Sequence, residues 1–195
     1  MEFFTSDTHF GHRNVITYCA RPFHDSDGNP DVDQMNREMI RLWNASVTPL
    51  DTVYHIGDFA MGPAALIPEY RGALNGRIVL ILGNHDRSAT RMLASGFDEV
   101  HKELWIERES RHIWLRHIPP STEEISKLSR PCDLVLNGHV HTDWLVKTKQ
   151  GIPLINVGTD VWWYKPWPLS SLLAALNGAR AWKARDQDDP HRPDS

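Results

Sequence analysis

The chain has 195 residues, of which 24% are charged and 41% hydrophobic, and its formal net charge is −4. This length fits one domain with a buried core, which we expect to span residues 1–185 and to be followed by a disordered tail over residues 186–195. The negative charge argues against a protein that binds nucleic acid through a broadly basic surface, although bound metal ions would reverse the charge locally.

The sequence also excludes several cellular settings. No apolar run is long enough to cross a membrane, and the N-terminus lacks the pattern of a secretion signal. Cys19 and Cys132 are far apart and form neither a redox motif nor a metal motif, so we expect both to be reduced. Together these features predict a cytoplasmic protein without a membrane partner.

Five short apolar runs predict buried strands, and each run is followed at once by polar residues. The runs are residues 3–4, 53–56, 78–82, 113–115 and 134–136. Helices are expected at residues 32–43, 88–95, 121–128 and 170–177, the last of them ended by Gly178. Strands that alternate with helices predict an α/β fold whose functional side chains lie at the strand ends.

The first two polar clusters are Asp7-Thr8-His9 and Gly57-Asp58. Residues two apart in an extended segment point the same way, so we expect Asp7 and His9 to share one ion. Gly57 allows a tight turn, after which the two oxygens of Asp58 could bridge two cations. Taken alone, each cluster has an ordinary alternative, a solvated loop or a simple Gly-Asp turn.

The cluster Gly83-Asn84-His85-Asp86 is more specific, because a simple turn does not explain why His and Asp follow Gly-Asn. Asn84 offers a neutral oxygen to a metal ion. His85 can carry a proton near neutral pH, and we expect Asp86 to orient or tune it.

Histidines follow the last two apolar runs. His117 comes after residues 113–115 and, taken alone, would be interpreted as a structural histidine. His139 and His141 are two residues apart and are expected to project together from the end of a strand. Imidazole is a common ligand of zinc, manganese and iron, so this pair indicates a metal site.

In this order the clusters resemble the calcineurin-like metallophosphoesterase superfamily, and in particular its small, stand-alone bacterial and phage members. The resemblance implies a sandwich of two β-sheets flanked by α-helices, in α/β/β/α layers. It also implies that His85 donates a proton to the leaving group or clamps the phosphoryl oxygen, assisted by Asp86. The two metal ions that it implies would be held by Asp7, His9, Asp58 and His141 and by Asp58, Asn84, His117 and His139, with Asp58 as the bridge.

Such a site predicts hydrolysis of phosphate esters. Two divalent ions outweigh the two aspartates, so the site attracts phosphate and can make a hydroxide from water. Mixed ligation by imidazole and carboxylate favours manganese, with iron, zinc, nickel and magnesium as alternatives. An open site favours phosphodiesters of nucleotides or nucleic acid over phosphomonoesters. Outside the enzymes, the pattern leaves open a non-catalytic interaction module, like the retromer subunit of this superfamily, or a metal sensor.

Several further residues have weaker assignments. His12 and Asn14 are expected in the substrate pocket, with capping of the next helix as the alternative for both. Arg21 is expected to hold a phosphate, or else to lie on the surface. His55 is expected to pack within a strand. The aromatic residues of segment 162–167 are expected in a core or an interface, with base stacking as the alternative. The oligomeric state does not follow from these patterns.

Overall fold

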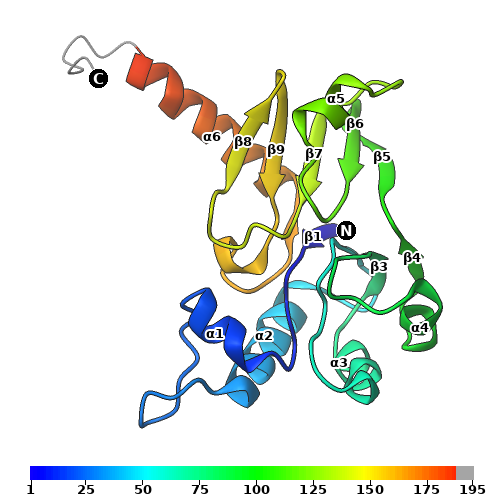
Figure 1. The fold of residues 1–195 in the computed structure, drawn as a ribbon, viewed down its shortest axis with the longest axis vertical. Coiled ribbons are helices and arrows are strands. Elements are labelled where there is room, and N and C mark those ends of the chain that lie inside the picture. Colours follow the sequence, from blue (N-terminus) through cyan, green and yellow to red (C-terminus); the bar gives the residue numbers. More distant parts are fainter. Residues whose placement is uncertain (188–195) are drawn as a thin grey trace.

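The computed structural model describes residues 1–187, and its strands form two five-stranded sheets (Figure 1). The first sheet has the order β10-β1-β2-β3-β4, with β1 at Glu2–Thr5, β2 at Thr52–His55, β3 at Arg77–Ile81, β4 at Glu99–His101 and β10 at Trp167–Pro168. The second has the order β5-β6-β7-β9-β8, with β5 at Leu104–Arg108, β6 at Arg111–Leu115, β7 at Leu134–Asn137, β8 at Val146–Lys149 and β9 at Ile152–Asn156. The five predicted apolar runs correspond to β1, β2, β3, β6 and β7.

The inner strands of both sheets are parallel. Strands β1 to β4 run in one direction, with β10 antiparallel at the edge. In the second sheet β6, β7 and β9 are parallel, and β5 and β8 are antiparallel at the two edges. Neighbouring parallel strands end at the same edge of a sheet, and residues that follow them therefore gather there.

Successive residues of the central strands face two different cores. Phe3 and Ile78 pack with Met39 of α2 on the outer side of the first sheet. Phe4 and Val79 pack toward the second sheet. Strands that are buried on both faces need apolar residues at almost every position, which explains why these runs are continuous rather than alternating.

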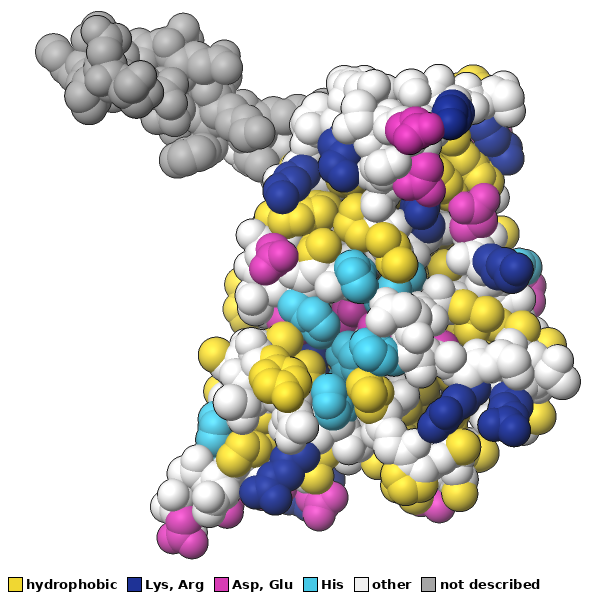
Figure 2. All heavy atoms as spheres, viewed as in Figure 1, with side chains coloured by type: hydrophobic (Ala, Val, Ile, Leu, Met, Phe, Trp, Pro, Cys, Tyr) yellow, Lys and Arg dark blue, Asp and Glu magenta, His cyan; other side chains and the backbone are white. Residues whose placement is uncertain are grey.

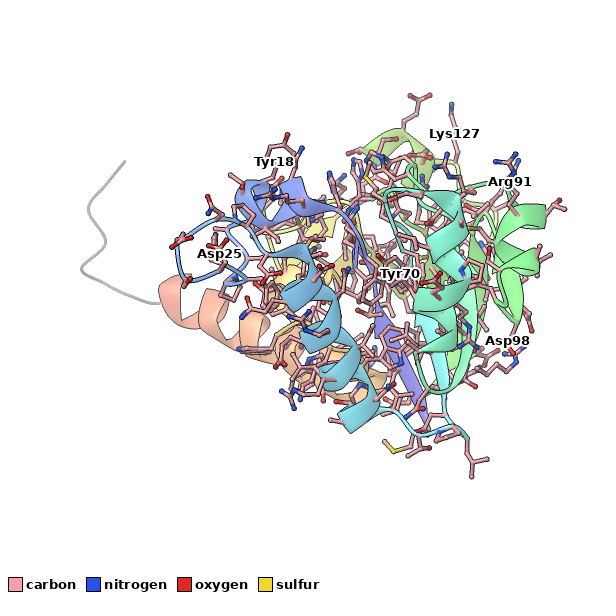
Figure 3. The ribbon with its side chains drawn as sticks, turned by 90° about the horizontal axis from the view of Figure 1, so that it is seen from below. Tyr18, Asp25, Tyr70, Arg91, Asp98 and Lys127 are labelled. Atoms are coloured by element: carbon pink, nitrogen blue, oxygen red, sulfur yellow. The ribbon has the colours of Figure 1, made fainter. Side chains whose placement is uncertain are left out.

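Helices cover the outer side of the first sheet, and Figure 3 shows α2 and α3 in front of it. This group comprises α1 (Arg13–Tyr18), α2 (Val32–Ser46), α3 (Ile67–Gly72), α4 (Ala89–Ala94) and the short 3-10 helix η1 (Ala64–Leu66). The remaining helices are α5 (Thr122–Ser126), α6 (Leu169–Gln187) and the 3-10 helix η2 (Thr159–Val161). Apolar residues of α6 join the core between the sheets. The predicted α/β/β/α class is confirmed.

The helix predictions are confirmed with small shifts, except at the last helix. Helix α2 begins after Asp31, whose carboxylate accepts the backbone N–H of Gln34 at 2.8 Å, and it runs to Ser46. The predicted end at Gly178 is wrong, because α6 continues to Gln187. The residues after Gly178 include alanine, arginine and lysine, strong helix formers that outweigh the cost of one glycine, about 1 kcal/mol.

Three sequence predictions concern the chain as a whole. Most of the predicted tail at 186–195 lies outside the described residues, which end at 187. Within those residues, no helix is both long and apolar enough to cross a bilayer. Cys19 and Cys132 are both free thiols, as expected.

Candidate metal centre

Polar side chains follow the C-terminal ends of five strands, three from the first sheet and two from the second. The seven predicted ligands are Asp7 and His9 after β1, Asp58 after β2, Asn84 after β3, His117 after β6, and His139 and His141 after β7. Figure 2 shows histidine side chains gathered in the middle of one face of the molecule. The topology therefore brings together residues that are far apart in the sequence.

Asp58 lies at the centre of the site. Its Oδ2 is 3.2 Å from Nε2 of His117 and 3.6 Å from Nε2 of His9. Ligand atoms of Asp7, His9 and His141 all lie within 4.8 Å of one another, and the same holds for Asp7, Asp58 and His117. Asp58 thus occupies the position between two groups of ligands that a bridging carboxylate requires.

Asn84 connects the remaining histidines. Its Oδ1 is 3.1 Å from Nε2 of His117 and 3.0 Å from Nδ1 of His139. The rings of His117 and His139 have centroids 5.3 Å apart. Asn84, His117 and His139 therefore form one side of the site, while His9 and His141 lie on the other side of Asp58.

Five of the predicted ligands have a left-handed backbone. The φ angle is 57° at Asp7, 50° at His9, 57° at Asp58, 73° at His139 and 42° at His141. Each such conformation costs roughly 1–3 kcal/mol and persists only where the surrounding structure fixes it. The prediction that Asp7 and His9 project from an extended segment is wrong. The left-handed backbone sets the direction of these side chains instead. The backbone N–H groups of Asp7 and His9 donate to the carbonyls of Gly57 and Asp58 at 2.9 and 3.1 Å.

The glycines of the motifs leave room for the carboxylates. A Cβ atom at Gly83 would lie 2.2 Å from Oδ1 of Asp58, and one at Gly138 would lie 2.5 Å from Oδ2 of Asp7. Both distances are far below van der Waals contact. The Gly residues before Asn84 and His139 are thus required by packing against Asp58 and Asp7.

His9 has the properties expected of an imidazole that binds a metal ion. Its side chain is buried, and neither ring nitrogen has a hydrogen-bond partner within the described structure. Burial lowers its pKa to about 3, so the ring is neutral at physiological pH. An unpaired buried polar group is costly, and coordination of a cation would remove that cost.

The carboxylates complete a donor set suited to divalent cations. Burial raises the pKa of Asp7, which disfavours its charge when no cation is bound. Burial also acts on Asp58, but the hydrogen bond and charge of His117 outweigh it and hold the pKa of Asp58 well below its usual range. Carboxylate, amide oxygen and imidazole ligands together fit manganese, iron or zinc.

His85 lies at the rim of the site, where its side chain is 44% exposed and its Nε2 is 4.0 Å from Oδ2 of Asp58. Asp86 does not contact the His85 ring by any hydrogen bond within residues 1–187. Its carboxylate instead accepts the backbone N–H groups of Asp58, Phe59 and Gly83 at 2.8–2.9 Å. The expectation that Asp86 orients His85 directly is therefore corrected: Asp86 fixes the loops after β2 and β3.

Arg21 is not placed to hold a phosphate, contrary to our expectation, because its side chain is fully buried. Its guanidinium donates to the backbone carbonyls of Asp7 and Thr8 at 2.7 and 2.9 Å. It also donates to both carboxylate oxygens of Asp160, at 2.7 and 3.2 Å. Arg21 thus supports the strained loop that carries Asp7.

Asp160 is a site residue that the sequence interpretation missed. Its Oδ2 lies 2.8 Å from Nδ1 of His141, which leaves the other ring nitrogen of His141 for a metal ion. A carboxylate behind a ligating histidine fixes the ring and raises its basicity. The signal was present, because the apolar residues of β9 are followed by Gly158-Thr159-Asp160 in the same manner as the other motifs.

Of the two residues expected in the substrate pocket, one lines a cavity beside the site and the other does not. His12 lines a cavity of about 410 Å³ beside the site, together with His9, His85 and His141. Asn14 is exposed and does not line this cavity.

His55 packs within the fold, as expected. It is fully buried, and its Nε2 is 2.9 Å from the hydroxyl of Thr8. Burial lowers its pKa to about 3, so it serves as a neutral partner of the loop between Asp7 and His9.

The expectation of a core position for the aromatic segment 162–167 is met fully by Trp162, while Tyr164 and Trp167 are partly buried against the cores. Trp162 is buried and donates its indole N–H to the carbonyl of Asn156 at 2.7 Å, and Trp167 donates to the carbonyl of Trp162 at 2.8 Å. Trp163 is 67% exposed, and none of these three tryptophans lines the 410 Å³ cavity.

Replacement of Gly83 by alanine tests the close packing around Asp58. We expect Gly83→Ala to weaken manganese binding about tenfold or more, because the added methyl group displaces the Asp58 carboxylate. Gly72→Ala is the control, since a Cβ at Gly72 meets no atom within 4 Å. Calorimetric titration of both variants with Mn²⁺ measures the effect, and equal affinities would contradict the packing argument.

Replacement of Asp160 by asparagine tests the support of His141. We expect Asp160→Asn to weaken the binding of one ion by roughly 10–100-fold while a second ion is retained. Asp98→Asn is the control because it breaks another Arg–Asp pair, 3.0 Å from Arg71, away from the site. If both variants lose thermal stability but bind metal like the unaltered protein, Asp160 has no role at the centre.

Comparison with known proteins agrees with this architecture. A curated protein of Methanocaldococcus jannaschii, itself uncharacterised, is 33% identical over 176 residues, which cover 88% of each chain. The Gene 66 protein of Mycobacterium phage L5 is 25% identical over 185 residues, covering 82% of this chain and 86% of the phage protein. The crystal structure of a protein of unknown function from Aquifex aeolicus superposes with a TM-score of 0.63 and 27% identity, over 85% of this chain and 94% of that one.

The family itself follows from a match over nearly the whole described chain. The family model for the calcineurin-like phosphoesterase superfamily domain matches residues 3–177, which include all seven predicted ligands and both sheets apart from the first residue of β1. The chain therefore belongs to the calcineurin-like phosphoesterase superfamily.

Proposed function

We propose that this protein is a binuclear metal-dependent phosphodiesterase that acts on nucleotides or nucleic acid. The observation that carries the proposal is the pair of ligand groups on either side of the buried Asp58 carboxylate. Membership of the superfamily supports a phosphate ester as the substrate and hydrolysis as the reaction.

The residues divide between two divalent ions. Asp7, His9 and His141 would hold one ion, Asn84, His117 and His139 the other, and Asp58 both. When bound, such ions lower the pKa of water and neutralise charge on the phosphoryl oxygens. The donor set favours manganese, with iron, zinc, nickel and magnesium as the alternatives.

His85 supplies the proton in this proposal. Hydrolysis breaks the bond between phosphorus and the leaving-group oxygen, which then needs a proton, while water supplies the new oxygen on phosphorus. His85 is suited to this role because its side chain is half exposed at the rim and lies close to Asp58. The His85 backbone N–H donates to Oδ1 of Asp58 at 2.9 Å, which ties the loop of the acid to the bridging ligand.

A non-catalytic module of the same fold is the alternative from another class. Such a module does not need the ligands, whereas here all seven lie together and the His85 side chain reaches the same centre. The complete set therefore favours hydrolysis over a purely structural role.

Removal of a ligand tests the second ion. We expect Asn84→Ala and His117→Ala to bind one manganese ion where the unaltered protein binds two, and to lose turnover of bis(4-nitrophenyl) phosphate. Metal content after reloading and the rate with excess Mn²⁺ measure the two effects. Full activity of either variant in excess metal would contradict the assignment.

Leaving-group dependence tests His85. We expect His85→Ala to slow the hydrolysis of diesters with alkoxide leaving groups by roughly 10²–10⁴-fold, because such a leaving group departs only when it is protonated. A nitrophenolate leaving group departs without a proton, so the hydrolysis of nitrophenyl diesters should slow much less. An equal loss on both substrate types would remove His85 from the role of acid.

A further inference from the structure

Two cavities adjoin the metal centre on different sides. The first has a volume of about 410 Å³, and the histidines that line it include His9, His85, His139 and His141. The second has a volume of about 260 Å³ and is lined by Asn84 and His117. The smaller cavity therefore meets Asn84 and His117, whereas the larger one meets His9 and His141 and also His139, and a phosphorus atom at the centre would have room for a substituent in each cavity.

The larger cavity has an apolar wall and an aromatic rim. Val15, Met61 and Val140 line it, and Tyr18 at the end of α1 stands at its edge. Tyr18 is 75% exposed, and Figure 3 shows it at the outer end of the helix. An exposed tyrosine ring beside an apolar wall is a platform for a flat, aromatic group.

The same cavity also has polar groups. Thr142 and Asp143 line it and offer a hydroxyl and a carboxylate. An alkyl chain would leave these groups without partners, whereas a nucleoside has sugar hydroxyls and base edges that can pair with them. The volume lies within the range of pockets that hold ligands of nucleoside size.

The smaller cavity has a basic character. Lys102 and Arg116 line it together with a single acidic residue, Glu103. The Arg116 guanidinium is held in place over the ring of Trp114, at 4.6 Å from its centroid, and by Glu124 at 3.0 Å. Glu124 occupies one guanidinium nitrogen, so further N–H groups remain for an anion.

The position of His85 decides which side departs. His85 lines the larger cavity and not the smaller one. The group that receives its proton therefore lies in the larger cavity, and the group in the smaller cavity keeps the phosphate.

We propose that the substrate is a short nucleotide phosphodiester that places its leaving nucleoside against Tyr18 and a further phosphate beside Lys102 and Arg116. This inference rests on the proposed function. Water adds its oxygen to the phosphorus, the bond from phosphorus to the nucleoside oxygen breaks, and His85 gives that oxygen its proton. The products are a free nucleoside and a nucleotide that carries both phosphates.

The products of a dinucleotide with a 5′-terminal phosphate test this orientation. The manganese-loaded protein should convert it to one nucleoside and one nucleoside 3′,5′-bisphosphate, and in ¹⁸O-labelled water the label should appear in the bisphosphate. Formation of two 5′-mononucleotides would overturn the proposal, because the arm with the terminal phosphate would then be the leaving group.

Variants test the two cavities separately. Lys102→Ala should raise KM about tenfold for the phosphorylated dinucleotide and leave KM for the unphosphorylated one unchanged. Tyr18→Ala should raise KM for both by about tenfold, whereas Tyr18→Phe keeps the ring and the affinity. Lys127→Ala and Leu50→Ala are controls, since both residues are exposed and line neither cavity. Unchanged KM values for Lys102→Ala and Tyr18→Ala would overturn the assignment.

A small diester separates the inference from the proposed function. If the unaltered protein does not hydrolyse bis(4-nitrophenyl) phosphate with any of the metals, the proposed function fails. If it hydrolyses this compound but does not cleave either dinucleotide, only the inference about the two cavities fails.

Discussion

One buried carboxylate, that of Asp58, joins the two halves of the fold. It follows a strand of the first sheet and lies 3.2 Å from His117, which follows a strand of the second. A buried charge of this kind is stable only with partners, and here they are histidines from both sides together with the backbone N–H of His85. The atoms that the proposed chemistry requires therefore also connect the two sheets.

A second layer of buried polar residues supports this centre. Arg21 holds the carbonyls of Asp7 and Thr8 and pairs with Asp160, which contacts His141. Asp86 accepts three backbone N–H groups from the loops after β2 and β3. Two of these contacts hold residues with a left-handed backbone directly, because Arg21 binds the carbonyl of Asp7 and Asp86 accepts the N–H of Asp58. Rigid support of this kind suits a site that must place several ligands at once.

The sequence was sufficient to predict five of the strands and the residues that meet at the centre, while the α/β/β/α layers were implied by the resemblance to the superfamily. The predicted strands and central residues rested on apolar runs that are followed by Asp, Asn or His, a pattern that does not depend on the local backbone conformation. The conformation itself was not predictable: Asp7 and His9 looked extended but are left-handed, because tertiary hydrogen bonds override local preference. The burial of Arg21 was also not predictable. It depends on a charged partner, Asp160, that lies 139 positions away in the sequence, and without that partner Arg21 was interpreted as a phosphate ligand.

The central claim is that two ions share Asp58, and electron paramagnetic resonance of the manganese-loaded protein tests it most directly. Two Mn²⁺ ions joined by one carboxylate lie about 3.5–4 Å apart and are magnetically coupled. We predict a coupled-pair spectrum at two ions per chain and its replacement by an isolated-ion spectrum in Asp58→Asn. An isolated-ion spectrum in the fully loaded, unaltered protein, or a coupled spectrum that survives Asp58→Asn, would contradict the account.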